Sequence, residues 1–347
     1  MSGAREGEGP QRRALRGLPI IAAILGVAAT AALVGIFGAG AVVRALISVG
    51  LVGFAAICGI HLVLTGIMGL AWRILLPGVP AGQVMWARLV RDSGSEALPL
   101  SQIGGYVLGA RVLILAGVSG TLSAGSTIVD VTLEFIAQLF YTALGLALLV
   151  RLQPDSDATV PVLAGLAVAA AAAAGFVIVQ RRGFAFLDRI TGALGQGWAE
   201  RTAAGAAALH AALADLYTRR ARLSASAALH LACWIASAAE IWLALRLAGE
   251  PLSFGAVLVI ESLLYAIRTA AFFVPQAYGV QEGAYILLGA SFGLSPDVAL
   301  ALSLLKRGRD LAIGLPAIAI WQAIEGRRLW RRRRATERAI VPAVPSE

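Results

Sequence analysis

Four polar side chains share one face of the last long apolar segment, and their types could hold an anion. Ser303, Lys306, Arg307 and Asp310 have offsets that place them on the same side of a helix. We predict that Lys306 and Asp310 pair along this helix and leave Arg307 to bind an anion, with Arg309 to one side. The planar donor fork of arginine suits phosphate, whereas a paired lysine acts as a point charge.

A break in the apolar pattern precedes that segment. Pro275, Gln276 and Gly279 interrupt the pattern, and Glu282 and Gly283 follow them. Irregular backbone at membrane depth is tolerated only where protein or a cavity satisfies its polar groups. A half-helix that begins at Gly279 would present N–H groups and a positive dipole end to an anionic head group. We predict a substrate-binding site here, in which Glu282 either caps the helix or takes part directly in ligand or proton binding.

Other ionisable residues lie inside apolar segments, where charges usually face a protein interior or a wet cavity. Arg111 is a candidate phosphate or carboxylate contact, and a side chain that snorkels to the membrane surface is the alternative. Asp130 and Glu134 stand one helical turn apart. We favour structural counter-charges for Arg111 and Arg268 over a proton relay. The remaining supporting charges are Glu240, Glu261 and Arg268.

The composition predicts a membrane protein. The 347 residues are 59% hydrophobic and 14% charged, with a mean hydropathy of +0.79, whereas soluble domains contain about 25% charged residues. We predict an all-α, polytopic integral membrane bundle. The net charge of +9 does not indicate nucleic-acid binding, because the arginines fall in short runs between apolar segments. The cysteine and histidine spacings predict neither a metal site nor a cofactor.

The apolar runs define the expected elements, at about 20 residues for each span. We predict about eight transmembrane helices plus one re-entrant or interfacial helical element. The spans are residues 18–43, 50–72, 127–150, 159–180, 223–247, 252–274, 279–293 and 296–321. A short helix at 83–92 is expected to lie in the membrane interface. Residues 98–118 either cross or re-enter.

Charge decides between these two readings of 98–118. If the segment crossed fully, the arginine-rich stretch 181–222 would lie outside, against the positive-inside rule. We therefore favour re-entry, which makes both termini cytoplasmic. Residues 1–17 are predicted to be a disordered cytoplasmic N-terminus, 18–325 a single transmembrane domain, and 326–347 a basic cytoplasmic tail. Within 181–222, amphipathic helices are expected to pack under the bundle rather than to serve a partner.

Two interrupted segments echo each other. Residues 99–110 (PLSQIGGYVLGA) and 275–290 (PQAYGVQEGAYILLGA) share a proline, a glycine-containing break, a tyrosine and a Leu-Gly-Ala ending. Paired interrupted segments in two halves of a chain point to a transporter binding site. In a chain so rich in alanine, leucine and glycine, chance similarity is the alternative.

The stretch 273–310 resembles the flippase-like membrane family that includes the transmembrane part of lysylphosphatidylglycerol synthases. VPQAYGVQEGAY, LSLLKRGRDLAIGLPA and LPLSQIGGYVLGAR are most similar to its HpnL subgroup, which is encoded with hopanoid biosynthesis genes. The resemblance covers about residues 15–325. It implies a multi-pass bacterial inner (plasma) membrane protein that transports a hopanoid or a related anionic or polar lipid without ATP hydrolysis.

The resemblance also assigns residues. It implies that Pro275, Gly279, Glu282 and Gly283 form the motif break and that Lys306, Arg309 and Asp310 are its charged partners. The family often has glycines directly after the proline, where this chain has Gln276 and Ala277. That departure makes the substrates of other members a poor guide.

Two alternatives to lipid transport stay open. One is an intramembrane transferase that acts on a polyprenyl or hopanoid lipid, with Glu282 or Asp310 as acid or base. The other is a non-catalytic assembly partner of lipid-synthesis enzymes, docked through 181–222. The sequence shows no nucleophile–base arrangement and no phosphate-binding loop, so we expect no enzyme activity.

Overall fold

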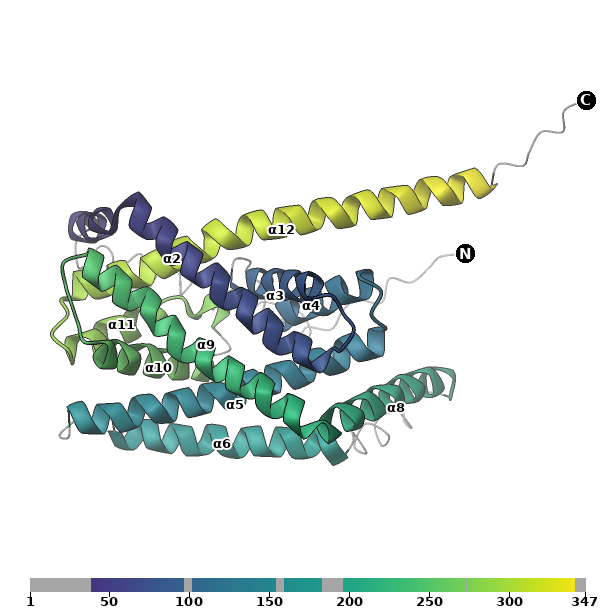
Figure 1. Cartoon of the computed structure of the whole chain (residues 1–347), viewed down its shortest axis with the longest axis horizontal. Coiled ribbons are helices and arrows are strands. Elements are labelled where there is room, and N and C mark those ends of the chain that lie inside the picture. Colours follow the sequence, from purple (N-terminus) through teal and green to yellow (C-terminus); the bar gives the residue numbers. More distant parts are fainter. Residues whose placement is uncertain (1–38, 97–101, 154–158, 183–195, 272–273, 341–347) are drawn as a thin grey trace, which may run out of the picture.

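The computed structural model describes residues 39–96, 102–153, 159–182, 196–271 and 274–340 (Figure 1), and within these ranges it contains helices and no strand. This confirms the predicted all-α class. The α-helices are α2 (Ala39–Leu75), α3 (Ala81–Glu96), α4 (Gln102–Leu115), α5 (Gly120–Leu152), α6 (Thr159–Arg182), α8 (Gln196–Thr218), α9 (Arg220–Leu247), α10 (Phe254–Ala270), α11 (Val280–Ala290) and α12 (Pro296–Ile340).

Three helices of the described part are long and apolar enough to cross a membrane by themselves: Val49–Leu75 within α2, Gly120–Leu152 (α5) and Arg220–Leu247 (α9). Helix α2 bends at Gly50, whose φ of 66° breaks the helical geometry. This bend lies at the predicted start of the second span. Most of the predicted first span, 18–43, lies outside the described residues, as does the predicted N-terminal segment 1–17.

Helices α3 and α4 form an antiparallel pair, here called hairpin A. Ser95 lies opposite Gly105, and Arg91 lies opposite Gly109, so residue numbers rise along one helix as they fall along the other. Close approach requires glycine at 105, because a Cβ there would lie 2.0 Å from Ser95 Oγ and 2.4 Å from the Arg91 carbonyl oxygen. The chain therefore turns back between α3 and α4. Residues 102–115 form one continuous helix, so the prediction that 98–118 re-enters by itself is wrong, because α3 forms the first arm of the hairpin.

The prediction of an interfacial helix at 83–92 is wrong. Helix α3 packs against α2, α4 and α12 inside the bundle, and only 3% of Arg88 and 1% of Arg91 is exposed. The sequence pattern misled because charged residues interrupt the apolar ones on this helix. These charges face partners inside the protein rather than water.

Helices α10 and α11 form a second pair, here called hairpin B, around the 3-10 turn Pro275–Ala277. They have 17 and 11 residues, fewer than the roughly 20 that a separate crossing needs. Segments 252–274 and 279–293 are therefore arms of one hairpin and not two spans. The arms are joined inside, where the Tyr285 hydroxyl donates to Glu261.

The two hairpins belong to similar units that run in opposite directions. Each unit consists of a long helix, a hairpin and a second long helix: α2, hairpin A and α5 in the first, and α9, hairpin B and α12 in the second. Figure 1 shows hairpin B at the left end of the bundle and hairpin A to the right of its centre. The described part of the echoing segment 99–110 lies in α4, and most of 275–290 lies in α11, the second arm of each hairpin.

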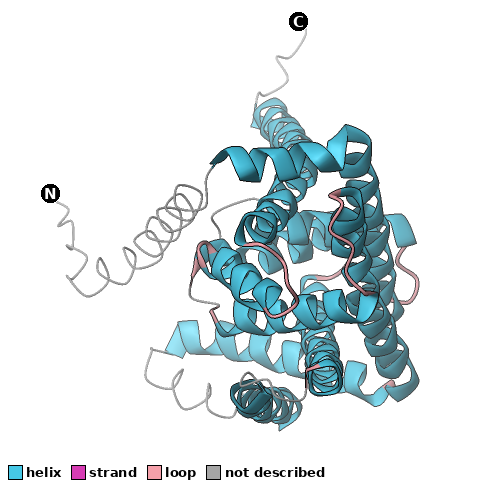
Figure 2. Cartoon of the chain, turned by 90° about the vertical axis from the view of Figure 1, so that its left-hand side faces the viewer, coloured by secondary structure: helices cyan, strands magenta, loops and turns pink. Residues whose placement is uncertain are grey.

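The remaining helices support these units. Helix α8 packs along α5, and its Leu213 and Leu216 are buried, so this part of 181–222 lies against the bundle as predicted. The end-on view in Figure 2 shows the helices gathered around the centre of the bundle. The last turns of α12 extend past the other helices.

Candidate functional site

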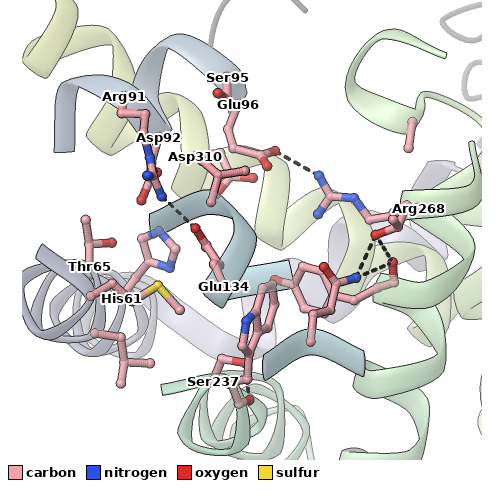
Figure 3. Close-up of a pocket in the computed structure, with 18 of the residues that line it drawn as sticks. His61, Thr65, Arg91, Asp92, Ser95, Glu96, Glu134, Ser237, Arg268 and Asp310 are labelled. Carbon is pink, nitrogen blue, oxygen red and sulfur yellow. Dashed lines mark hydrogen bonds and ion pairs between the residues drawn. The ribbon is translucent and has the colours of Figure 1, made fainter. Parts of the chain in front are cut away.

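A cavity of about 310 Å³ lies where the two hairpins meet (Figure 3), and residues from α2, α3, α5, α9, α10 and α12 line it. Its wall contains four arginines and five carboxylates, so it is polar but close to neutral. The charged residues are Arg88, Arg91, Arg268, Arg309, Asp92, Glu96, Glu134, Glu240 and Asp310. Charges at membrane depth are expected to face such an interior.

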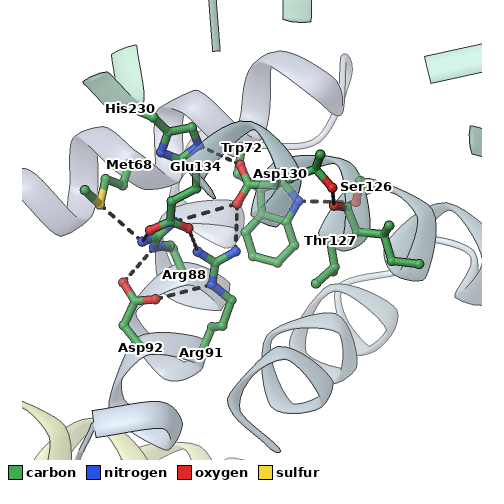
Figure 4. A network of polar contacts seen from close by, with 12 residues as sticks. Met68, Trp72, Arg88, Arg91, Asp92, Ser126, Thr127, Asp130, Glu134 and His230 are labelled. Atoms are coloured by element: carbon green, nitrogen blue, oxygen red, sulfur yellow. Dashed lines mark hydrogen bonds and ion pairs between the residues drawn. The ribbon is translucent and has the colours of Figure 1, made fainter. Parts of the chain in front are cut away.

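One wall of the cavity belongs to a buried ion-pair network on hairpin A, here called the α3 cluster (Figure 4). Arg91 lies 2.7 Å from Asp130 and 2.6 Å from Glu134, and Arg88 lies 2.6 Å from Glu134. His230 Nε2 contacts Asp130 at 3.0 Å. Asp130 and Glu134 are thus counter-charges, but their partners are Arg88 and Arg91 instead of the expected Arg111 and Arg268. The cluster fastens hairpin A to α5.

A second network, the α12 cluster, joins hairpin B and α9 to α12. Lys306 lies 2.7 Å from Glu261, and Arg307 lies 2.6 Å from Glu282. The prediction that Lys306 pairs with Asp310 and leaves Arg307 for an anion is therefore wrong. Helical spacing describes only one helix, whereas each buried cation here takes a carboxylate from a neighbouring helix.

Arg309 completes the α12 cluster. It contacts Glu240 of α9 and its own neighbour Asp310, the latter at 2.7 Å. Both Arg309 and Asp310 line the cavity. Of the basic residues 306, 307 and 309, only Arg309 reaches the cavity wall, although the sequence placed it to one side.

The turn of hairpin B has a strained backbone held by Arg307 and Glu282. Gln276 and Ala277 have φ values of 57° and 47°, a region that costs a non-glycine residue about 1–2 kcal/mol. Arg307 donates to the carbonyl oxygens of both residues, at 3.2 and 3.4 Å. Glu282 accepts the Gly279 N–H at 2.8 Å and so caps α11. The positions at which glycines are expected from the resemblance are those with left-handed backbone, and here Arg307 stabilises that backbone.

The two hairpins contact each other directly at the cavity. Arg268 of α10 lies 2.8 Å from Glu96 at the end of α3, and Gln276 Nε2 donates to the Ser95 carbonyl oxygen at 2.9 Å. The Arg268–Glu96 ion pair joins residues 172 positions apart in the sequence. Here the two inverted units meet.

The structure brings some of the predicted site residues to the cavity and separates others from it. Those that line it are Gln276, Arg309, Asp310, Glu134, Glu240 and Arg268. Those that do not are Arg111, Pro275, Gly279, Glu282, Gly283, Lys306, Arg307, Asp130 and Glu261. Arg111 is 42% exposed and pairs with Glu325 at 2.7 Å, so it is no part of this cavity.

Sequence reasoning missed several polar residues of the cavity wall, among them His61, Arg88, Arg91, Asp92 and Glu96. The signal for the arginines was present, because Arg88 and Arg91 are three positions apart on one helical face. The irregular alternation of charged and apolar residues at 83–92 instead predicted a helix in the membrane interface. His61 lines the cavity and contacts Glu240 at 3.1 Å.

The chemistry of the site is that of reversible polar contacts. Within the ranges that the structure describes, no group of three or more His, Cys, Asp or Glu side chains is arranged to hold a metal ion. Each of the four arginines of the wall is paired with a carboxylate, so a bound polar group would exchange partners with existing ion pairs. In a low-dielectric interior such exchange costs less than leaving a charge unpaired.

Fold and site together define a multi-pass helical membrane protein with two opposed hairpins around a charged cavity. The family model described as the lysylphosphatidylglycerol synthase TM region matches residues 21–317. The chain belongs to this family. No curated protein and no solved structure gives a significant match.

Proposed function

We propose that this protein moves a polar lipid between membrane leaflets, with the lipid head group passing through the cavity between hairpins A and B. The observation that carries the proposal is the arrangement of two inverted helix–hairpin–helix units whose turns meet at one charged cavity. Inverted units with interrupted helices at a central site are a recurring design of transporters, in which one unit moves against the other. The family is associated with membrane lipids.

The lipid chains would stay in the bilayer while the head group exchanges ion pairs. An anionic part of the head group would bind Arg268 or Arg309. A cationic or hydroxyl part would bind the carboxylate that has lost its arginine partner. When a head group separates Arg268 from Glu96, one of the two polar contacts between the hairpins is lost. Head-group binding is thereby linked to relative motion of the units.

We infer the orientation from charge. The start of α9 at Arg220 and the end of α12 lie at the end of the bundle from which hairpin A enters. Applying the positive-inside rule, we assign that end to the cytoplasm, with both termini there and the protein in a bacterial inner membrane. Hairpin A then enters from the cytoplasmic side and hairpin B from the opposite side.

For the substrate we propose a hopanoid or a related polar lipid, on the strength of the HpnL-like motifs, and no ATP hydrolysis. The intramembrane transferase alternative needs an acid or base that faces the lipid. Asp310 lines the cavity, whereas Glu282 is committed to Arg307, Ser303 and Gly279. The assembly-partner alternative would use the part of α8 that faces away from α5.

The test measures the leaflet distribution of each lipid class in cells that lack the protein and are complemented by variants of the Glu96–Arg268 pair. Wild type should restore the distribution. Glu96→Arg or Arg268→Glu alone should fail, because like charges then face each other between the hairpins. The double exchange should restore a substantial part, because an ion pair reforms.

The result would separate the alternatives. A lipid class retained on one leaflet and rescued by the double exchange supports transport and identifies the substrate. A normal distribution with one modified lipid missing would show a transferase instead. If no lipid changes in amount or distribution, transport is wrong and the assembly role remains.

A further inference from the structure

His61 is the histidine of this protein that lines the cavity. The chain has three histidines, all within the described ranges. His230 is fully buried against Asp130, and His210 lies on α8. By contrast, 28% of the His61 side chain is exposed, and the residue lines the cavity. Figure 3 shows it in the cavity wall on α2.

The carboxylate beside His61 is shared with an arginine of the same cavity. Glu240 Oε1 lies 3.1 Å from His61 Nδ1, and Glu240 Oε2 accepts from Arg309. Arg309 in turn holds Asp310 at 2.7 Å. These four residues connect α2, α9 and α12.

This group can hold one added proton. With His61 neutral, the four residues contain one cation and two carboxylates. An imidazole ring is the side chain that most readily gains and loses a proton near neutral pH. Because Nδ1 is bonded to Glu240, Nε2 is the ring atom that takes the proton. The other charged groups facing the cavity, listed by helix, are Arg88, Arg91, Asp92 and Glu96 of α3, Glu134 of α5, and Arg268 of α10.

We propose that His61 binds the coupling proton of the transport cycle, so that one proton moves with each lipid. This inference rests on the proposed function. When His61 Nε2 takes a proton from water in the cavity, the imidazolium at Oε1 neutralises Glu240 and weakens the attraction of Oε2 for Arg309. Arg309 is then available to an anionic group of the head group. Loss of the proton on the other side returns Glu240 to Arg309, and the head group is released.

The test uses purified full-length protein in liposomes with acyl-chain-labelled phosphatidylethanolamine or phosphatidylglycerol as the probe. Dithionite reports the fraction of label in the outer leaflet, and an ionophore clamps the membrane potential. With one proton per lipid, a gradient of one pH unit supports a leaflet ratio of about tenfold. Wild type should approach that unequal distribution.

The variants decide whether His61 is responsible. Under the same gradient, His61→Gln should bring the label to equal amounts in both leaflets, because the glutamine side chain cannot bind the proton. This final distribution does not depend on how fast the variant moves the lipid. His210→Gln, a histidine change outside the cavity, should match wild type. An equal distribution in wild type, or an unequal one in folded His61→Gln, would overturn the coupling role and leave lipid transport standing.

A second measurement reads the proton directly and does not depend on lipid movement. In protein labelled with ¹⁵N-histidine, the three imidazoles are assigned with His61→Gln and His210→Gln. We expect the ring ¹⁵N resonances of His61 to change with pH, and to change differently in Glu240→Gln, which lacks the carboxylate beside the ring. A His61 resonance that does not titrate would refute the proton site. If no probe lipid moves but His61 titrates as expected, the proton site stands and the proposed transport fails for those lipids.

Discussion

Hairpins A and B are fastened in the same way with charges of opposite sign. Hairpin A contributes the cations Arg88 and Arg91, and the following helix α5 contributes carboxylates. Hairpin B contributes the carboxylates Glu261 and Glu282, and the following helix α12 contributes Lys306 and Arg307. The fold requires that each buried charge has a partner of opposite sign. It does not determine whether the hairpin or the following helix contributes the cation. Two units can therefore be alike in geometry and have little sequence in common.

The largest effect should come from breaking the α3 cluster. Arg91→Met removes a cation that is 1% exposed and leaves Asp130 and Glu134 with fewer partners. Loss of one member of a buried ion pair typically costs about 3–5 kcal/mol. We expect a large fall in the thermal unfolding temperature of the detergent-purified protein. Arg91→Lys keeps the charge and should lower the unfolding temperature less than Arg91→Met. An equal decrease in the two variants would argue against an electrostatic role.

The matching change beside hairpin B, at Lys306 of α12, should destabilise the protein less. Lys306→Met removes the cation beside Glu261, but the Tyr285 hydroxyl still donates to that carboxylate. A remaining hydrogen bond reduces the penalty, so we expect a loss of about 2–4 kcal/mol, again measured by thermal unfolding. Adding Tyr285→Phe should increase the loss beyond the sum of the single changes. A Lys306→Met protein less stable than Arg91→Met would reverse the ranking of the two hairpins.

The second arms of the hairpins should differ in their tolerance of a methyl group. Gly105→Ala would place a Cβ against Ser95 and the Arg91 carbonyl, whereas a Cβ at Gly283 meets nothing within 4 Å. We expect Gly105→Ala to destabilise by about 1–3 kcal/mol through overpacking. Gly283→Ala should stay within about 1 kcal/mol of wild type or be stabilising, because alanine favours the helix. Side-by-side unfolding of the two variants checks this, and equal effects would refute the difference in packing.

The smallest effect is expected at Arg111. Its contact with Glu325 is partly exposed, and such pairs contribute less than about 1 kcal/mol. Arg111→Ala should therefore change neither the unfolding temperature nor lipid distribution measurably. A loss of lipid transport in a stable Arg111→Ala protein would return this residue to the list of site candidates.

Much of the fold could be predicted from the sequence. Composition gives an all-helical membrane protein because a chain so apolar, with basic runs between apolar segments, has few other stable forms. The position of the basic stretch 181–222 predicted a turned-back element near 98–118, although the structure forms it from α3 and α4 together. The echo between 99–110 and 275–290 marked equivalent parts of two units. Each of these predictions depends on composition or on residues close together in the sequence, and not on which helices pack together.

The cavity and its contacts were decided by tertiary structure. Spacing along α12 placed Lys306 near Asp310, but packing of α10 and α11 supplied Glu261 and Glu282 as partners. The shared carboxylate Glu240 joins His61 and Arg309, which are far apart in sequence. The sequence indicates which charged residues are buried, because they lie within long apolar segments. Because an ion pair forms with the nearest suitable group in space, only the packing of helices decides which charges meet.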